Sequence, residues 1–351
     1  MKPDSPAAQM ALSEEYVRNF FMYTDHDNDA IAELFRLSVF RTSAALGMGW
    51  EIPEDDARLT RNTEYLKDTF TPGLVDPKTL ADSEAQLASF PDVYFRIKEV
   101  LDSPVSSADD VARIVSSDME LTAKLLKLVN SPFYGLMETV EDVAHAIALV
   151  GVTEVSNLAL GISAIKVFKD IPPELMDVKT FWRHSVSCGV FAKLIASRIP
   201  GLKADRFFTA GLLHDVGRLI IFKKLPYASV QTLLYARENM LPLVDAERDI
   251  LGFDHTEVGN MILTEWRFPQ TLVDAMTWHH KPSEAQDPQG AAIIQLADNM
   301  TNAMEISIGG MYVLPGLEDG AWERLGLKPS DLVSIVGLFD THIDELFASF
   351  L

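Results

Sequence analysis

Residue types that bind transition metals are concentrated between residues 180 and 300, where five of the eight histidines of this chain fall. The most unusual stretch is "AGLLHDVGRLIIF" (residues 210–222), in which His214 and Asp215 stand side by side in an otherwise apolar run. A buried charge is costly unless it is paired with an opposite charge or coordinates a metal. The stretch therefore predicts a partner for Asp215, and a metal ion is one such partner.

The complete candidate set contains five imidazoles and two carboxylates: His184, His214, His255, His279, His280, Asp215 and Asp298. Each lies on a segment that the sequence predicts to be helical or to end a helix, so four or five helices could direct these side chains into one bundle centre. Seven ligands exceed one tetrahedral site and suit two metal ions that share a bridging carboxylate, with positions left for water. An ordinary hydrogen-bonded pair is the alternative for His214 and Asp215.

Two ligands that are neighbours in the sequence can contribute to one metal cluster if they lie at the end of a helix. Neighbouring residues of a helix diverge by about 100°, so His214 and Asp215 cannot bind side by side as a simple chelate. Near the end of a helix they can reach different edges of one cluster, and the same holds for His279 and His280.

Several other polar residues receive a structural interpretation. His145 and His342 are expected to be ordinary packed or hydrogen-bonded histidines, and Cys188 stands among small residues that suit close helix packing, with no flanking charge to lower its pKa. The stretch "DHDNDA" spaces three aspartates like a calcium loop, but Ala30 stands where the turn needs Gly and Arg36 stands where a bidentate Glu belongs. We interpret it as a capping run before the next helix.

Helical periodicity dominates the chain and predicts an all-α protein. In "VARIVSSDMELTAKLLKLVN" (residues 111–130) apolar residues recur at spacings of three, four and seven, whereas long alternating stretches are hard to find. Helix-start signals recur at Ser107, Thr139, Asp254, Pro269 and Ser330.

Turn-rich segments suggest three parts. Residues 1–80 are predicted to form a helical N-terminal extension, residues 81–305 the main helical domain, and residues 306–351 a C-terminal tail that ends in an amphipathic helix. The extension contains no constellation of catalytic residue types, and we expect it to pack on the core or to form a partner interface.

Composition limits the partners. The formal net charge of −21 and the pI near 4.7 repel nucleic acid and anionic membrane surfaces, and an anionic substrate would need a strong local cation such as a metal. No apolar run approaches the roughly 18 residues of a membrane span, and the N-terminus lacks the pattern of a signal peptide. We therefore expect a cytoplasmic protein that binds neither nucleic acid nor a membrane.

Two long segments resemble one known family. The segment "DMELTAKLLKLVNSPFYG" and the ordered set "FWRHSVS", "LLHDVGR", "DHTEVG", "WHHKP" and "QLADNM" are similar to the HDOD (HD-related output domain) branch of the HD superfamily of metal-dependent phosphohydrolases. The resemblance covers roughly residues 83–305 and implies a helical bundle of the HD type.

The resemblance also implies how the ligands are divided. One ion would be held by His184, His214, Asp215 and Asp298, and the other by Asp215, His255, His279 and His280, so that Asp215 forms the bridge. Mixed imidazole and carboxylate ligands suit iron, manganese, nickel or zinc better than calcium or magnesium.

Departures from the family pattern leave two functions open. Active cyclic-dinucleotide phosphodiesterases of the superfamily follow the paired histidines with Glu and a GYP loop, whereas Lys281 stands here and no GYP occurs. Arg218 replaces the Lys expected after "HDVG" and could still bind phosphate.

The first hypothesis is a two-metal phosphohydrolase that acts on a phosphate-containing small molecule, with Asp215 and Arg218 in catalytic roles. The alternative is a non-catalytic signalling or scaffold module that contacts a protein partner and whose metal cluster is structural or sensory.

Overall fold

The fold is built from helices. The computed structural model describes residues 5–52, 75–81, 92–103, 107–165, 168, 171, 175–304 and 313–350, and every regular element in these ranges is a helix. This confirms the all-α prediction. The first half of the chain forms α1 (Pro6–Phe20), α2 (Asp29–Gly47), α4 (Pro77–Ala81), α6 (Asp92–Asp102), α7 (Ala108–Ser116), α8 (Met119–Val129), α9 (Val143–Val150) and α10 (Val152–Ile165).

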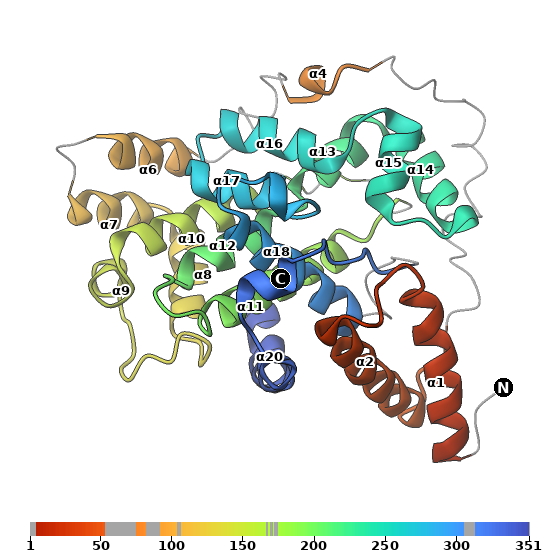
Figure 1. Cartoon of the computed structure of the whole chain (residues 1–351). Coiled ribbons are helices and arrows are strands. Elements are labelled where there is room, and N and C mark those ends of the chain that lie inside the picture. Colours follow the sequence, from red (N-terminus) through yellow and green to blue (C-terminus); the bar gives the residue numbers. More distant parts are fainter. Residues whose placement is uncertain are drawn as a thin grey trace.

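The second half contains the helices that carry the candidate residues. They are α11 (Val178–Ala196), α12 (Asp205–Leu213), α13 (Val216–Lys224), α14 (Pro226–Asn239), α15 (Leu243–Leu251), α16 (His255–Glu265), α17 (Gln270–Thr277), the 3₁₀ turn η1 (Pro282–Glu284), α18 (Pro288–Met304), α19 (Ala321–Leu325) and α20 (Pro329–Phe350). The long helix α11 packs against α12, α18 and α20. Figure 1 shows α11, α12 and α18 in the middle of the molecule, with α20 below them, α16 above them, α6–α9 on the left and α14 and α15 on the right.

The predicted helix starts agree with the structure in most places. The Ser107 hydroxyl and the Asp110 carboxylate form a reciprocal capping box at α7, and Asp254 caps α16 by accepting from the backbone N–H groups of Thr256 and Glu257. The periodic stretch 111–130 is divided between α7 and α8, because Asp118 caps the start of α8. Periodicity alone does not reveal this break, since apolar residues on both sides of it face the same core.

Two glycines of the "AGLLHDVGRLIIF" stretch allow the helices that carry His214 and Asp215 to approach their neighbours closely. A Cβ added at Gly211 would lie 2.7 Å from the backbone of Cys188 and Gly189 in α11. One added at Gly217 would lie 2.0 Å from the carbonyl oxygen of His255 in α16. Because these distances are far below van der Waals contact, only Gly allows the turn between α12 and α13 to sit between α11 and α16.

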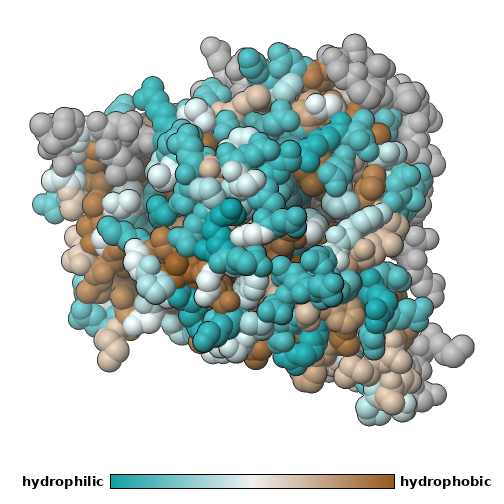
Figure 2. Space-filling model, viewed as in Figure 1, coloured by the Kyte–Doolittle hydropathy of each residue, from teal (hydrophilic) through white to brown (hydrophobic). Residues whose placement is uncertain are grey.

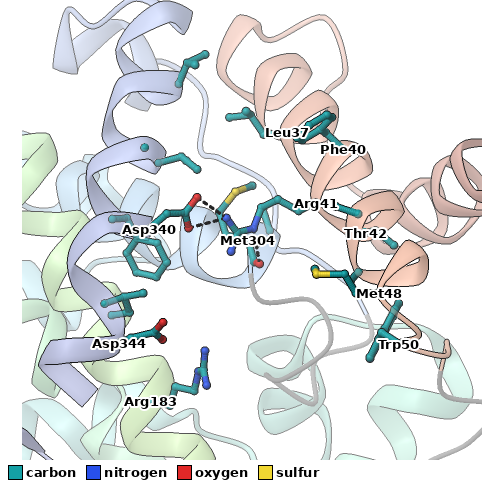
Figure 3. Close-up of a pocket in the computed structure, with 18 residues that line it drawn as sticks. Leu37, Phe40, Arg41, Thr42, Met48, Trp50, Arg183, Met304, Asp340 and Asp344 are labelled. Atoms are coloured by element: carbon teal, nitrogen blue, oxygen red, sulfur yellow. Dashed lines mark hydrogen bonds and ion pairs between the residues drawn. The ribbon is translucent and has the colours of Figure 1, made fainter. Parts of the chain in front are cut away.

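The N-terminal helices pack on the C-terminal part of the bundle. Helix α1 packs on α2, which contacts α18 and α20. The Ser38 hydroxyl donates to the carbonyl oxygen of Ala303 at 2.8 Å, and Arg41 forms an ion pair with Asp340 at 2.6 Å. A cavity of about 640 Å³ lies between α2 and α20, and Figure 3 shows Arg41 reaching across it to Asp340. The boundaries predicted at 80/81 and 305/306 remain predictions, because they adjoin residues 82–91 and 305–312, which lie outside the described residues.

The surface seen in Figure 2 is mainly hydrophilic, with hydrophobic residues gathered beside α6–α9. Among the described residues, no helix combines the length and the apolar character needed to cross a membrane.

Candidate metal centre

The His214–Asp215 pair lies at the turn between α12 and α13. His214 follows the last residue of α12, and Asp215 directly precedes α13. The Nδ1 atom of His214 lies 2.8 Å from the carbonyl oxygen of Gly211, which can only accept a hydrogen bond. Nδ1 therefore carries a hydrogen, and Nε2 is the ring nitrogen that lies near Asp215 and Asp298. The helix end thus lets the two adjacent side chains serve different edges of one site, as the sequence predicted.

Histidines and carboxylates from α11, the α12–α13 turn and α18 converge. His184 Nε2 lies 3.1 Å from Asp298 Oδ1. His214 Nε2 lies 3.5 Å from the same Asp298 oxygen and 3.4 Å from Asp215 Oδ2.

A second group lies on the other side of Asp215. His255 is the first residue of α16, and its Nε2 lies 3.1 Å from Asp215 Oδ1 and 3.3 Å from His280 Nε2. His279 and His280 follow the end of α17. The Nδ1 atom of His279 lies 2.6 Å from the carbonyl oxygen of Met276, so its Nε2 is likewise directed to the cluster, 4.0 Å from Asp215 Oδ1. Asp215 thus touches both groups.

All seven predicted residues take part in groups whose potential ligand atoms lie within 4.8 Å of one another. In the described part of the chain these groups contain no other residue: His184 with His214 and Asp215, His214 with His279 and Asp298, and His255 with His279 and His280. The structure therefore brings together every residue of the candidate set. It places His214 and His279 in a common group, which the family-based division into two sets did not include.

Several buried atoms of the cluster lack a hydrogen-bond partner. They are the Nε2 atoms of His184, His214 and His279, and Oδ1 of Asp215. Some lie near a carboxylate or an imidazole, but without the geometry of a hydrogen bond. Buried polar atoms are nearly always partnered, and inward-facing imidazole and carboxylate atoms are what a transition metal coordinates. The donor set therefore fits divalent transition metal ions.

The pKa shifts differ among the members of the cluster. Burial alone would raise the pKa of Asp215, but the positive charge of Arg218 and the neighbouring histidines hold it well below the ordinary value. Burial would likewise raise the pKa of Asp298, but the neighbouring His184 and His214 hold it well below the ordinary value. Burial, reinforced by His214, lowers the pKa of His279 to about 3, and burial together with His279 lowers that of His280. The carboxylates are thus ionised and these two imidazoles are neutral, which are the forms that bind metals. Burial lowers the pKa of the other two buried rings, but Asp215 raises that of His214 and Glu247 raises that of His255 to about 9, so a metal ion would displace a proton from these two rings.

Two charged residues surround the cluster. Arg218, buried in α13, places Nη1 2.5 Å from Asp215 Oδ2, so it contacts the cluster instead of facing solvent. Glu247 in α15 is 3% exposed and lies 2.5 Å from His255 Nδ1. Glu247 was not among the residues predicted from the sequence, although its place on the buried face of an amphipathic helix, eight residues before His255, was a detectable signal.

The residues given a structural interpretation lie outside the cluster groups. His145 is on α9 and pairs with Glu138 at 3.5 Å, and the His342 ring contacts Phe133. Cys188 is buried, and burial raises the pKa of its thiol. In the "DHDNDA" run, Asn28 caps α2, which agrees with the capping interpretation.

The cluster is largely closed to solvent. His214 and Asp215 are each 1% exposed, and His255 and His279 are fully buried. His280 is half-buried and borders a cavity of about 240 Å³ that is also lined by Lys281.

Comparison with known families matches this chain to a helical domain family. The model of the HDOD domain family matches residues 87–282, more than half of the chain, and lies within the region of resemblance at residues 83–305. The match includes six of the seven candidate residues and ends before Asp298.

Solved structures share the fold. An HDOD domain protein from Geobacter sulfurreducens is 24% identical, with a TM-score of 0.56 over 84% of this chain and 97% of that chain. A candidate phosphohydrolase from Shewanella amazonensis SB2B is 19% identical, with a TM-score of 0.58 over 77% of this chain and 100% of that chain. A candidate signal transduction protein from Marinobacter aquaeolei VT8 is 18% identical, with a TM-score of 0.56 over 95% of this chain and 67% of that chain.

A curated relative is longer than this chain. An uncharacterised protein from Treponema pallidum (strain Nichols) is 26% identical over 228 residues, which are 64% of this chain and 43% of the relative. The chain thus corresponds to less than half of that protein.

Proposed function

This chain belongs to the HDOD domain family, and we propose that it is a signalling protein that acts as a metal-dependent phosphohydrolase. The proposed cofactors are two divalent transition metal ions, drawn from iron, manganese, nickel and zinc. Their proposed ligands are the seven clustered residues His184, His214, Asp215, His255, His279, His280 and Asp298. Structural neighbours described as candidate phosphohydrolases and as a signal transduction protein support the two halves of the proposal.

The observation that carries the proposal is the set of buried, unpartnered Nε2 atoms that face Asp215 and Asp298. The backbone carbonyls of Gly211 and Met276 hold two of the rings with Nδ1 outward. Such preorganisation of ring orientation is typical of metal-binding histidines. Ions bound here would lower the pKa of water toward neutrality and polarise phosphoryl oxygens.

The charge of the cluster favours an anionic substrate. The buried groups include the carboxylates of Asp215, Asp298 and Glu247 and the guanidinium of Arg218. Two divalent ions would therefore leave an excess of positive charge, which a phosphate group could neutralise. Arg218 would act chiefly by holding the Asp215 carboxylate in place, and a direct contact between Arg218 and a substrate phosphate remains a prediction.

The closed environment of the cluster favours a second candidate function. Catalytic metal sites keep a position open to substrate, whereas four residues of this cluster are at most 1% exposed. A structural or sensory cluster, whose output is contact with a protein partner, would need only the small opening beside His280.

The deciding experiment combines metal analysis with turnover. We expect the full chain, purified anaerobically and reconstituted with iron, manganese, nickel or zinc in turn, to bind two ions and to hydrolyse a generic phosphomonoester. Asp215→Ala should abolish both properties. Cyclic dinucleotides that contain guanine should be poor substrates, since the GYP loop is missing.

Each outcome discriminates between the functions. Fewer than about 0.3 ions per chain with every metal would contradict the metal centre. Two bound ions without turnover of phosphomonoesters or phosphodiesters would contradict the hydrolase and support the sensory or scaffold module.

A further inference from the structure

Glu247 is a carboxylate where the pattern of its helix calls for an apolar residue. Its neighbours on the buried face of α15 are Leu243, Val244, Ala246 and Leu251. The helix ends at Gly252, whose left-handed backbone (φ 83°) turns the chain back toward α16. This turn brings the Glu247 side chain against the first residue of α16.

One carboxylate oxygen of Glu247 contacts both the backbone N–H and the ring Nδ1 of His255. Oε2 of Glu247 accepts from the His255 backbone N–H at 3.0 Å and lies 2.5 Å from Nδ1. Because an ionised carboxylate can only accept, Nδ1 carries the hydrogen and Nε2 is directed at Asp215 and His280. The other oxygen, Oε1, lies 3.8 Å from Arg218 Nε.

The ring of His255 cannot be oriented by a backbone carbonyl, as the rings of His214 and His279 are. The Nδ1 atoms of His214 and His279 bond the carbonyl oxygens three residues earlier, at the ends of α12 and α17. His255 stands at the start of a helix, and the residues before it are not helical, so no preceding carbonyl is presented in that way. A side chain from another helix must supply the acceptor, and Glu247 is placed to do so.

We infer that Glu247 is the positioning residue of the metal centre, which fixes the ring of His255 with Nε2 toward the ions and strengthens it as a ligand. A carboxylate does more than a backbone carbonyl, because its negative charge increases the electron density that the imidazole donates. Through Arg218 the same carboxylate is linked to Asp215, the residue shared by both groups. The inference rests on the proposed function only in requiring that the cluster binds metal.

A graded pair of variants tests the inference in the full-length protein. Glu247→Gln keeps an oxygen acceptor but removes the charge, whereas Glu247→Ala removes both. We expect the affinity for Co²⁺ or Zn²⁺, measured by competition with a chelator, to fall about 10–100-fold in Glu247→Ala and less in Glu247→Gln. The ligand-field absorption of the Co²⁺-loaded protein should shift in both variants.

Asp274→Ala is the matched control. Asp274 is also a buried carboxylate, but its two oxygens accept from the backbone N–H groups of Gln286 and Asp287 instead of contacting a cluster histidine. Its loss should lower the melting temperature while leaving the metal affinity and the Co²⁺ spectrum of the folded protein unchanged.

The outcomes separate the two proposals. Metal affinity and Co²⁺ spectra that are equal in the wild type and both Glu247 variants would overturn the positioning role and leave the proposed function standing. Equal losses of affinity in Glu247→Ala and Asp274→Ala would also overturn it, because the effect would then be general destabilisation. A wild-type protein that binds no metal would overturn the proposed function itself, and the positioning role with it.

Discussion

At the scale of single residues, the protonation state of each buried carboxylate depends on which charged groups lie beside it. Asp215 is buried, and its two oxygens lie beside Arg218 and His255. Glu154 is also buried, but its surroundings are different. The Tyr134 hydroxyl lies 3.2 Å from it, and Lys193, paired with Asp205 at 2.8 Å, is the nearby cation. The first environment lowers the pKa of its carboxylate, whereas the second raises the pKa of Glu154 to about 7.

Asp215→Ala distinguishes a metal bridge from an ordinary buried ion pair. If Asp215 holds both ions, the variant loses both, whereas His255→Ala chiefly weakens one. Binding to the native state alone stabilises by about 4 kcal/mol at a thousandfold excess over Kd. Excess manganese or zinc should therefore raise the melting temperature of the wild type and hardly change that of Asp215→Ala.

Thermal melts of both proteins with and without metal give the answer. Equal shifts in the two proteins, or none in either, would exclude the bridging role of Asp215. The variant would then lose only about 1–3 kcal/mol for an unsatisfied partner.

The raised pKa of Glu154 predicts that its contribution to stability falls as the pH rises through the acidic range. Burial, reinforced by Asp205, raises its pKa from 4.5 to about 7, although Lys193 and the Tyr134 hydroxyl oppose the shift. The folded state thus binds this proton more tightly than the unfolded state. The contribution of Glu154 to the free energy of unfolding is therefore fully present below pH 4.5. It is lost as the pH rises from 4.5 to 7, which lowers the free energy of unfolding by on the order of 3 kcal/mol.

Urea unfolding at several pH values checks this in Glu154→Gln. The free energy of unfolding of the wild type, minus that of the variant, should decrease across that interval and be constant above about pH 8. A difference independent of pH would show that the pKa of Glu154 is the same in the folded and unfolded states.

At the scale of helices, the site depends on two close approaches. Gly211 brings α12 onto α11, and Gly217 brings α13 onto α16. These contacts set the separation of His184, His214 and His255, which no single helix determines. Glycine costs helix stability in each case, but a side chain at either position would push apart the helices that carry the ligands.

Gly217→Ala should therefore damage both stability and metal binding. Its Cβ would lie 2.0 Å from the His255 carbonyl oxygen, so α13 or α16 must shift. We expect a loss of about 1–3 kcal/mol or more, with weaker metal binding in whatever protein folds. Denaturant melts and metal titration measure the two effects.

Gly337→Ala in α20 is the control, because a Cβ there meets nothing within 4 Å. It should stabilise the protein by about 0.5–1 kcal/mol through helix propensity. Equal effects of the two substitutions would contradict the close-packing explanation.

At the scale of the whole molecule, the ends of the chain are joined to its centre. Helix α2 contacts α18, which carries Asp298, and α20, which packs on α11, the helix of His184. The buried side chains of α1, α2 and α20 belong to the same hydrophobic core as those of α11 and α18. The N-terminal helices thus cover part of the bundle that forms the site.

We expect the N-terminal helices to unfold together with the rest of the described chain. Trp50 follows α2 and contacts Tyr16 of α1, so its fluorescence reports on the N-terminal pair. In a variant in which Phe replaces the other four tryptophans, the fluorescence midpoint should coincide with that of far-UV circular dichroism. An earlier fluorescence midpoint would show that α1 and α2 unfold independently.

The sequence by itself determined the helical class and the set of seven candidate residues. Apolar spacing of three and four residues indicates helices locally, and the seven candidates were favoured over ordinary buried residues because their order and spacing resemble the HDOD family. The adjacency of His214 and Asp215 was correctly predicted to require a helix end, because neighbouring side chains of a helix diverge.

The tertiary structure alone decided how these residues meet. Glu247 lies eight residues before His255, but only the turn at Gly252 presents its carboxylate to the imidazole. The ion pair between Arg218 and Asp215 depends on how the side chains of α13 pack against the neighbouring helices. The grouping of His214 with His279 depends on the approach of α12 and α17. Contacts of this kind arise from helix crossings, and local sequence patterns do not encode the distance or angle at which two helices cross.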